Sequence, residues 1–386
     1  MGRLRWLTAG ESHGKGLIGI IEGLPAGLQI DEQLIVTQLT RRQHGHGRGK
    51  RMKIETDHAE IYTGVRLGKT LGSPIALVLP NKDWSNWAHI MPVEATDKSP
   101  KPITLPRPGH GDLAGAMKFG TADIRNILER ASARETAMRV ALGTIARELL
   151  SEVGIQVGSR VIGIGNVTDS SSLPQDLKPN ALNEIVDDSP VRVFDRKLEG
   201  AMTAAIDEAK EAGDSVGGTF QVIAAGVPYG LGSHTQWDLK LKAKLGQAIL
   251  SINAIEGVEI GYGFKGGAAF GSAYHDEIVH GDDGRITRLT NHAGGIESGI
   301  SNAQPIVIQA VMKPIPTLTK PLRSVDIVTG QPGLAHKERT DACAVPAAAV
   351  VAESMVCLTI AEELLDKFGG DSLDQLQAHM AATAKY

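Results

Sequence analysis

Residues 132–167 read SARETAMRVALGTIARELLSEVGIQVGSRVIGIGNV, a helical pattern followed directly by a strand pattern. Apolar residues recur at helical spacing over Ala133–Val153. Ser132 and Glu135 have the spacing of a capping box, in which Ser132 caps the helix and Glu135 reaches back to the cap. The run Ser159–Val167 is rich in Ile and Val, which is typical of a strand. The stretch therefore predicts a long capped helix that leads into a strand.

The same two patterns recur along the whole chain, without a linker or a shift in composition between them. Further strands are predicted at Leu17–Glu22, Ser73–Leu79, Gly218–Val227 and Pro305–Met312. Further helices are predicted at Glu32–Arg42, Arg196–Ala212, Asp238–Ala254 and Pro346–Phe368. Strands and helices are mixed but do not alternate in strict βαβ order, so the pattern favours an α+β fold over a doubly wound parallel sheet. The 386 residues suffice for two or three average domains or for one large domain.

The composition is that of a soluble globular protein, with 42% hydrophobic and 22% charged residues. Glycine is enriched, at 45 residues, which indicates tight turns and close approaches of the backbone to a ligand. Two cysteines, Cys343 and Cys357, cannot form a disulfide framework. The most apolar stretch, Ala342–Ala352, is shorter than the roughly 18 residues that span a bilayer. We therefore expect a cytoplasmic protein without a membrane partner.

A dense positive segment stands out from this acidic background. Residues 41–53, RRQHGHGRGKRMK, hold six Arg or Lys and no acid, whereas the whole chain has a net charge of −4. The segment is compatible with a nucleic-acid patch, a solvated surface loop, or the wall of a pocket for a small polyanion. His44 and His46 lie among these cations, which would repel a divalent ion, so we expect no metal site.

Histidine, arginine and glycine are concentrated in four stretches. These are residues 10–14 (GESHG), the basic segment 41–53, residues 107–112 (RPGHGD) with 130–134 (RASAR), and residues 339–346 (RTDACAVP). A single histidine among them would more often be structural, and a single arginine a surface charge. Together, glycine-flanked histidines, unpaired arginines and helix N-termini indicate a site for a multiply charged anion.

These stretches resemble the characteristic segments of the chorismate synthase family, in the same order and over essentially the whole chain. The resemblance continues through SINAIEG, GGIESGISNAQPI and KPIPT to RTDACAVPAAA. Two departures are small, since Gly111 stands where the family commonly has Ala and Ala131 where it commonly has Ser.

The resemblance implies one domain over residues 1–386, a β-α-β sandwich with central helices between antiparallel sheets, and a homotetramer. It implies elimination of phosphate from 5-enolpyruvylshikimate 3-phosphate to give chorismate, with reduced FMN as cofactor. That substrate carries about four negative charges, which would explain the basic segment. NADPH is a possible reductant. Because no Gly-x-Gly-x-x-Gly motif joins a strand to a helix, dependence on a separate flavin reductase is favoured.

The resemblance also implies residue roles. His13 would protonate the departing phosphate, His110 would supply a proton near the flavin, and Asp341 would help to remove the substrate proton. Substrate contacts would come from Ser12, His13, Arg42, Arg48, Arg51, Arg107, Arg134 and Arg339. Cofactor contacts would come from Arg42, Arg48, Arg130, Ala131, Ser132, Asn253, Ala254, Ser298, Lys313, Pro314, Ile315, Pro316, Thr317 and Arg339.

The rival interpretation is a nucleic-acid-binding protein that uses residues 41–53. The negative net charge and an aromatic content of only 4% argue against it, because few side chains could stack on bases.

Overall fold

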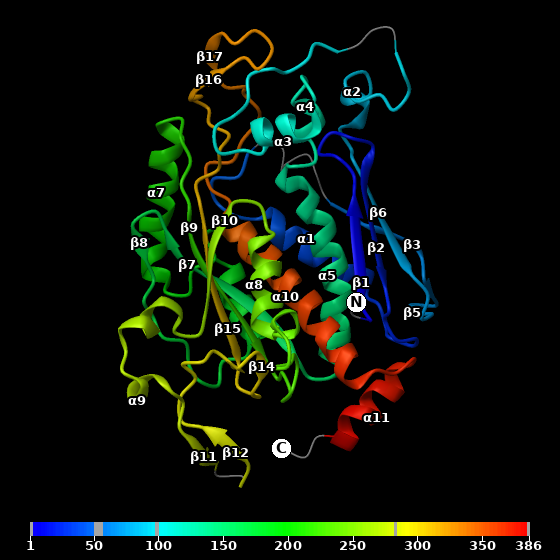
Figure 1. Cartoon of the computed structure of the whole chain (residues 1–386), viewed down its shortest axis with the longest axis vertical. Helices are drawn as coiled ribbons and strands as arrows, with labels where there is room; N and C mark the ends of the chain where they lie inside the picture. The colour runs from blue at the N-terminus through cyan, green and yellow to red at the C-terminus, as the bar shows by residue number, and fades with distance from the viewer. Residues whose placement is uncertain (1–2, 50–56, 97–99, 282–283, 384–386) are drawn as a thin grey trace.

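The computed structural model describes residues 3–49, 57–96, 100–281 and 284–383, and it places two antiparallel sheets on either side of a central pair of helices (Figure 1). The pair consists of α5 (Thr136–Glu152) and α10 (Val345–Phe368), which pack side by side. The prediction of an α+β fold with helices between antiparallel sheets is confirmed.

The first sheet lies against α5. Its strand order is β1 (Arg5–Ala9), β2 (Gly16–Glu22), β6 (Ile75–Pro80) and β3 (Glu60–Thr63). Side chains alternate in β2, where Leu17 and Ile21 are buried against the helix and Ile18 is exposed. Between the two buried residues lies Gly19, where an added Cβ would come within 2.5 Å of Met138 Sδ on α5. Glycine at this position therefore lets the helix approach the sheet closely.

The second sheet lies against α10. Its order is β10 (Ile255–Ile260), β15 (Ile306–Met312), β9 (Gly218–Ala225), β7 (Gln156–Ile164) and β8 (Val167–Thr168). The strand predicted at 159–167 is wrong at its end, because the chain reverses after Ile164. Gly165 takes φ +58° in this reversal, and Val167 pairs back with Ile164.

Further helices complete the layer between and around the sheets. They are α1 (Glu32–Gln43), which contacts both central helices, α8 (Leu241–Leu250), which contacts α10, and α6 (Pro179–Asp187), α7 (Glu199–Glu211) and α11 (Leu373–Thr383). The predicted helix 238–254 is too long at both ends. Lys240 is extended and separates α8 from a 3-10 turn, and Ala254 has φ +64°.

Short elements surround this framework. At one end of the molecule lie α2 (Trp84–Trp87), α3 (Asp112–Phe119), α4 (Arg125–Leu128), β16 (Arg323–Val325) and β17 (Pro332–Leu334) (Figure 1). At the other lie β11 (Ile278–His280) and β12 (Ile286–Arg288). The rest are β4 (Val65–Arg66), β5 (Lys69–Thr70), η2 (Ala133–Glu135), η3 (Arg196–Leu198), η4 (Trp237–Leu239), η5 (Gly263–Ala268), α9 (Gly271–Tyr274), β13 (Ile296–Glu297) and β14 (Ile300–Ser301).

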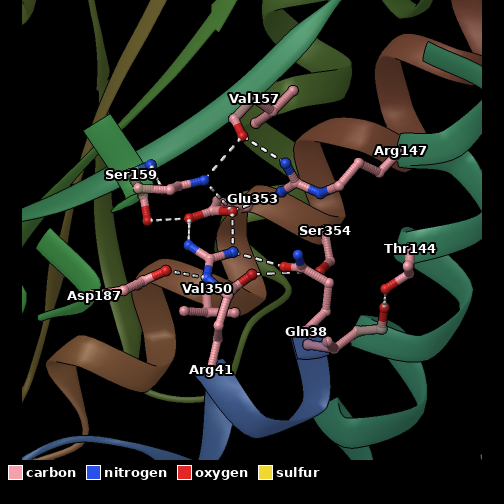
Figure 2. A network of polar contacts seen from close by, with 12 residues as sticks. Gln38, Arg41, Thr144, Arg147, Val157, Ser159, Asp187, Val350, Glu353 and Ser354 are labelled. Atoms are coloured by element: carbon pink, nitrogen blue, oxygen red, sulfur yellow. Dashed lines mark hydrogen bonds and ion pairs between the residues drawn. The ribbon is translucent and has the colours of Figure 1, made fainter. Parts of the chain in front are cut away.

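Helix α10 is the core of the fold. It is long and apolar enough to cross a membrane, whereas the apolar run considered in the sequence, Ala342–Ala352, was too short to do so. However, 94% of the most apolar stretch of the helix is buried inside the protein. One acid, Glu353, lies in the middle of the helix with no exposed surface. Its carboxylate accepts hydrogen bonds from Arg41 at 2.9 Å, Arg147 at 2.6 Å and Ser159 at 2.6 Å (Figure 2).

This network fixes the start of the basic segment. Arg41 lies in the last turn of α1 and is 9% exposed, and it also donates to Asp187 at 2.6 Å. The first of the six cations is therefore a core residue, tied to α10 where α1 ends. The network thereby fixes the position at the end of α1 from which residues 42–49 continue.

Candidate active site

One cavity of about 440 Å³ lies where α10 and the turn before α5 begin. Segments from all four His- and Arg-rich stretches meet in its wall. The predicted site residues that line it are Ser12, His13, Arg42, Arg48, Arg107, His110, Ala131, Ser132, Arg134, Asn253, Ala254, Lys313, Ile315, Pro316, Thr317, Arg339 and Asp341. Residues separated by more than 300 positions in the sequence therefore share one cavity.

Three of the predicted residues that the structure describes are not in this wall. Arg130 points instead to the end of β1, where its guanidinium donates to the carbonyls of Thr8 and Gly10 at 3.0 Å. Ser298 lies in the tight turn between β13 and β14, with φ +51°. Pro314 lies between two lining residues without lining the cavity itself. Arg51 lies outside the described residues.

Four arginines of the wall, Arg42, Arg48, Arg107 and Arg134, are paired with carboxylates, which corrects the prediction of unpaired arginines for these four. Arg48 binds Asp341 at 2.7 Å, and Arg134 binds Asp57 at 2.7 Å. A guanidinium withdrawn from water is costly unless hydrogen-bonded partners compensate it. Asp341 pairs with Arg48, not with its sequence neighbour Arg339, and accepts the backbone N–H of Gly49 at 2.6 Å.

Arg42 and Arg107 are fixed by hydroxyls as well as acids. Arg42 donates to Thr136 Oγ1 at 3.0 Å and to the carbonyl of Ala133 at 2.9 Å, at the start of α5. Arg107 donates from Nε to Asp112 at 2.8 Å and from Nη1 to Thr317 at 2.9 Å. These bonds hold the side chains in place at the cavity.

The basic segment therefore turns inward as far as it is described. Arg41 lies in the core, and Arg42 and Arg48 line the cavity. His46 Nε2 lies 2.7 Å from the carboxylate of Asp207, away from the cavity lining. Among residues 41–49 the arginines form no outward stripe for a nucleic-acid backbone, which leaves the rival interpretation without support.

Both predicted catalytic histidines contact a buried carboxylate. His13 Nδ1 lies 2.9 Å from Glu129, and the ring stacks on Trp87 with a centroid separation of 3.7 Å. His110 Nδ1 lies 2.6 Å from Asp112. Burial raises the pKa of Asp112, but hydrogen bonds from His110 and Arg107 outweigh burial and hold that pKa below its usual range.

The turn before α5 is one of two helix starts at the cavity. The predicted cap is confirmed for Ser132, whose hydroxyl accepts the N–H of Arg134 at 3.3 Å. The other half of the predicted capping box is wrong, because the Glu135 carboxylate binds Arg139 one turn further on. The second start is that of α10, with a proline in its first turn as predicted.

The side chain of Asn253 has a buried acceptor atom, Oδ1, that is not satisfied within the described residues. Its Nδ2 donates to the carbonyl of Ala131 at 3.0 Å, while Oδ1 is buried and has no hydrogen-bond partner among the described residues. Buried polar atoms are nearly always satisfied in native proteins. An unsatisfied acceptor in a cavity wall therefore fits a ligand that brings an N–H or O–H group.

Sequence reasoning missed the acids and the aromatic ring around the site. These residues are Asp57, Trp87, Asp112, Glu129 and Glu338, of which Glu338 itself lines the cavity. Asp112 had a local signal, since it follows His110 by two positions. Asp57, Trp87 and Glu129 are distant in sequence from the site residues that they contact, whereas Glu338 precedes Arg339 and contacts His336 at 2.9 Å.

The fold and the site define a protein that binds a small, multiply charged anion beside helices enclosed by two antiparallel sheets. The sequence model of chorismate synthase matches residues 4–365. The chorismate synthase of Geobacillus sp. (strain WCH70) is 50% identical to this chain, over 99% of each of the two chains. That of Aquifex aeolicus is 51% identical, over 97% of this chain and 96% of the relative. A crystal structure of chorismate synthase superposes with a TM-score of 0.79 at 41% identity, over 99% of this chain and 97% of that one. The chain belongs to the chorismate synthase family.

Proposed function

We infer that this chain eliminates phosphate from 5-enolpyruvylshikimate 3-phosphate to give chorismate, the last common step of the shikimate pathway. The observation that carries the inference is the meeting of all four His- and Arg-rich stretches in one cavity. Family membership supports the same reaction, that of a carbon–oxygen lyase acting on a phosphate. We propose that residues 1–386 act as a single domain.

The substrate and the cavity wall match in charge and in donor geometry. A phosphate and two carboxylates present planar or tetrahedral arrays of acceptors, and guanidinium groups bind such arrays through parallel N–H donors. We propose that Arg42, Arg48, Arg107 and Arg134 bind these groups, together with Ser12. Arg339 at the rim and Arg51 complete the proposed set.

Reduced FMN is the proposed cofactor, and the cavity wall fits it. The unsatisfied Oδ1 of Asn253 suits a ligand N–H, and Lys313 with the Ser132 helix start suits a phosphate. Ala131, Ala254, Ile315, Pro316 and Thr317 would pack around the cofactor, with Arg130, Ser298 and Pro314 as further proposed contacts. When bound, a reduced flavin supplies electron density transiently to the elimination, without net oxidation.

Proton handling falls to residues of the chain itself. We propose that His13 gives a proton to the departing phosphate and that His110 holds a proton near the cofactor. Histidine suits this work because its proton affinity lies near neutral pH. We propose Asp341, held by Arg48 and Gly49, as the carboxylate that helps to take up the substrate proton.

The direct test is an anaerobic assay of phosphate release from 5-enolpyruvylshikimate 3-phosphate, with chemically reduced FMN and with or without NADPH. Turnover that needs reductant only to prime the flavin supports the elimination. Consumption of one reductant per turnover, or no phosphate release, refutes it. Activity with oxidised FMN and NADPH as the only reductant would show that the chain reduces its own flavin. No activity under these conditions would favour a separate flavin reductase. We further propose a cytoplasmic homotetramer, which sedimentation would test.

Variants separate the proposed roles. His110→Ala should lower turnover while leaving the fold intact, and Asp341→Asn should slow C–H cleavage and change its isotope effect. Arg48→Ala should weaken substrate binding. Wild-type turnover, an unchanged isotope effect or an unchanged affinity would remove the corresponding residue from its role.

A further inference from the structure

Each of the two cavity histidines is held by a carboxylate that does not itself line the cavity. Glu129 is 2% exposed and contacts Nδ1 of His13 at 2.9 Å. Asp112 has no exposed surface and contacts Nδ1 of His110 at 2.6 Å. The same ring nitrogen is engaged in both cases, although the two histidines lie on unrelated segments of the chain.

An arginine also binds each carboxylate. Arg125 donates to Glu129 Oε1 at 2.7 Å, and Arg107 donates to Asp112 Oδ2 at 2.8 Å. An adjacent guanidinium stabilises the ionised form of a carboxylate and so reduces its tendency to take the proton of the imidazole. In each arrangement the carboxylate accepts from both an arginine and a histidine. Arg107 Nη2 also lies 3.2 and 3.3 Å from the two ring nitrogens of His110.

Glu129 constrains more of His13 than its ring. The backbone N–H of His13 donates to Glu129 Oε2 at 2.9 Å, and the backbone N–H of Ser12 donates to the carbonyl of Glu129 at 2.9 Å. Trp87 lies against the face of the His13 ring with an interplanar angle of 27°. The ring is thus fixed at its edge by one residue and at its face by another.

We propose that Glu129 is a positioning residue that keeps a proton on Nδ1 of His13, so that proton exchange with a bound phosphate occurs at Nε2. Asp112 likewise keeps a proton on Nδ1 of His110. In the protonated ring, Nε2 gives its proton to the phosphate as the electron pair of the broken C–O bond leaves with it. The ring that remains is neutral, with its Nδ1 proton still bound to Glu129. The catalytic consequence rests on the proposed function, whereas the tautomer does not.

Nitrogen-15 NMR of the ligand-free protein labelled at histidine tests the tautomer directly. His13 is assigned by its loss in His13→Gln, and its neutral ring is expected as the Nδ1–H form. In Glu129→Gln this preference should weaken, because the negative charge that holds the proton is gone. Glu135→Gln is the matched control, since it removes a buried acid that binds Arg139 rather than a histidine, and it should leave the His13 signals unchanged. A neutral Nε2–H form in the wild type, or an unchanged tautomer ratio in Glu129→Gln, overturns the proposal.

Kinetics test the consequence in the intact enzyme. Glu129→Gln should lower the turnover of phosphate release by at least about 10-fold, and Asp112→Asn should do likewise. In a His13→Ala background, Glu129→Gln should cause almost no further loss, because its effect acts through the histidine. An equal loss in both backgrounds would show a merely structural role and overturn the proposal. If the wild type releases no phosphate, the proposed function fails while the NMR result still decides the tautomer.

Discussion

A buried acid on α5 should make the protein less stable as the pH rises toward 8. Glu148 is 8% exposed, and one of its oxygens accepts the backbone N–H of Asp31 at 2.6 Å, at the cap of α1. The other oxygen is buried without a hydrogen-bond partner among the described residues. Burial raises the pKa of Glu148 from 4.5 to about 8; the hydrogen bond from Asp31 opposes that shift, and the negative charge of Asp31 adds to it.

The sign of the effect follows from proton linkage. Below pH 4.5 both the folded and the unfolded chain hold this proton, so the group costs nothing. Between pH 4.5 and 8 the unfolded chain loses the proton while the folded chain keeps it, so the free energy of unfolding falls by up to about 1.4 kcal/mol per pH unit. Over the interval of about 3.5 units, from 4.5 to 8, the upper limit is about 5 kcal/mol.

Glu148→Gln mimics the neutral acid and should remove this dependence. Its amide oxygen can still accept the Asp31 N–H, so the variant should match the wild type near pH 4.5 and exceed it by several kcal/mol at pH 8. Urea unfolding followed by tryptophan fluorescence at pH 5, 6, 7 and 8 measures the difference. Glu152→Gln, an exposed acid near the end of the same helix, is the control and should follow the wild type. Parallel stability curves for wild type and Glu148→Gln would refute the reasoning.

Three further substitutions test the packing and the site. Glu353→Gln should lower the free energy of unfolding by about 3–5 kcal/mol in urea titrations, because the buried guanidinium groups of Arg41, Arg147 and Arg192 would lose the carboxylate that they share. Gly143→Ala should lower the free energy of unfolding by about 1–3 kcal/mol, measured by calorimetry or urea titration, because its Cβ would lie 2.4 Å from Ser354 Cβ where α5 and α10 touch. An unchanged free energy of unfolding would show that the two helices can move apart there without cost. Asn253→Ala should weaken the binding of reduced FMN by roughly 10-fold in an anaerobic fluorescence titration, whereas equal affinity would remove this residue from the cofactor site.

Much of the framework was predictable because its signals are local. The helix over residues 133–153 is marked by apolar spacing and by the cap at Ser132, and the strands by runs of β-branched residues between glycines. The errors fell where one backbone angle decides the outcome. Gly165 turns the chain within a run that reads as one strand, and Ala254 adopts a left-handed conformation that its residue type does not suggest.

The wall of the site was predictable only in part. Its histidines and arginines stand in unusual glycine-rich contexts, and the family resemblance names them together. Their acidic partners do not stand out, because Asp57 and Glu129 resemble any other surface acid in the sequence. Their role appears only when tertiary folding brings Asp57 to Arg134, 77 positions away, and Glu129 to His13, 116 positions away.

The acidic partners change how the cavity recognises an anion. Unpaired arginines would attract a polyanion over a long range and with strong dependence on salt. Arg48 and Arg134 instead carry carboxylates at 2.7 Å, so each pair presents little net charge at a distance. A guanidinium has five N–H donors, of which a carboxylate engages at most a few, and the carboxylate holds the fork in one orientation. If Arg48 and Arg134 bind the substrate as proposed, selectivity for a phosphate with two carboxylates depends on the fixed directions of these donors more than on the number of positive charges.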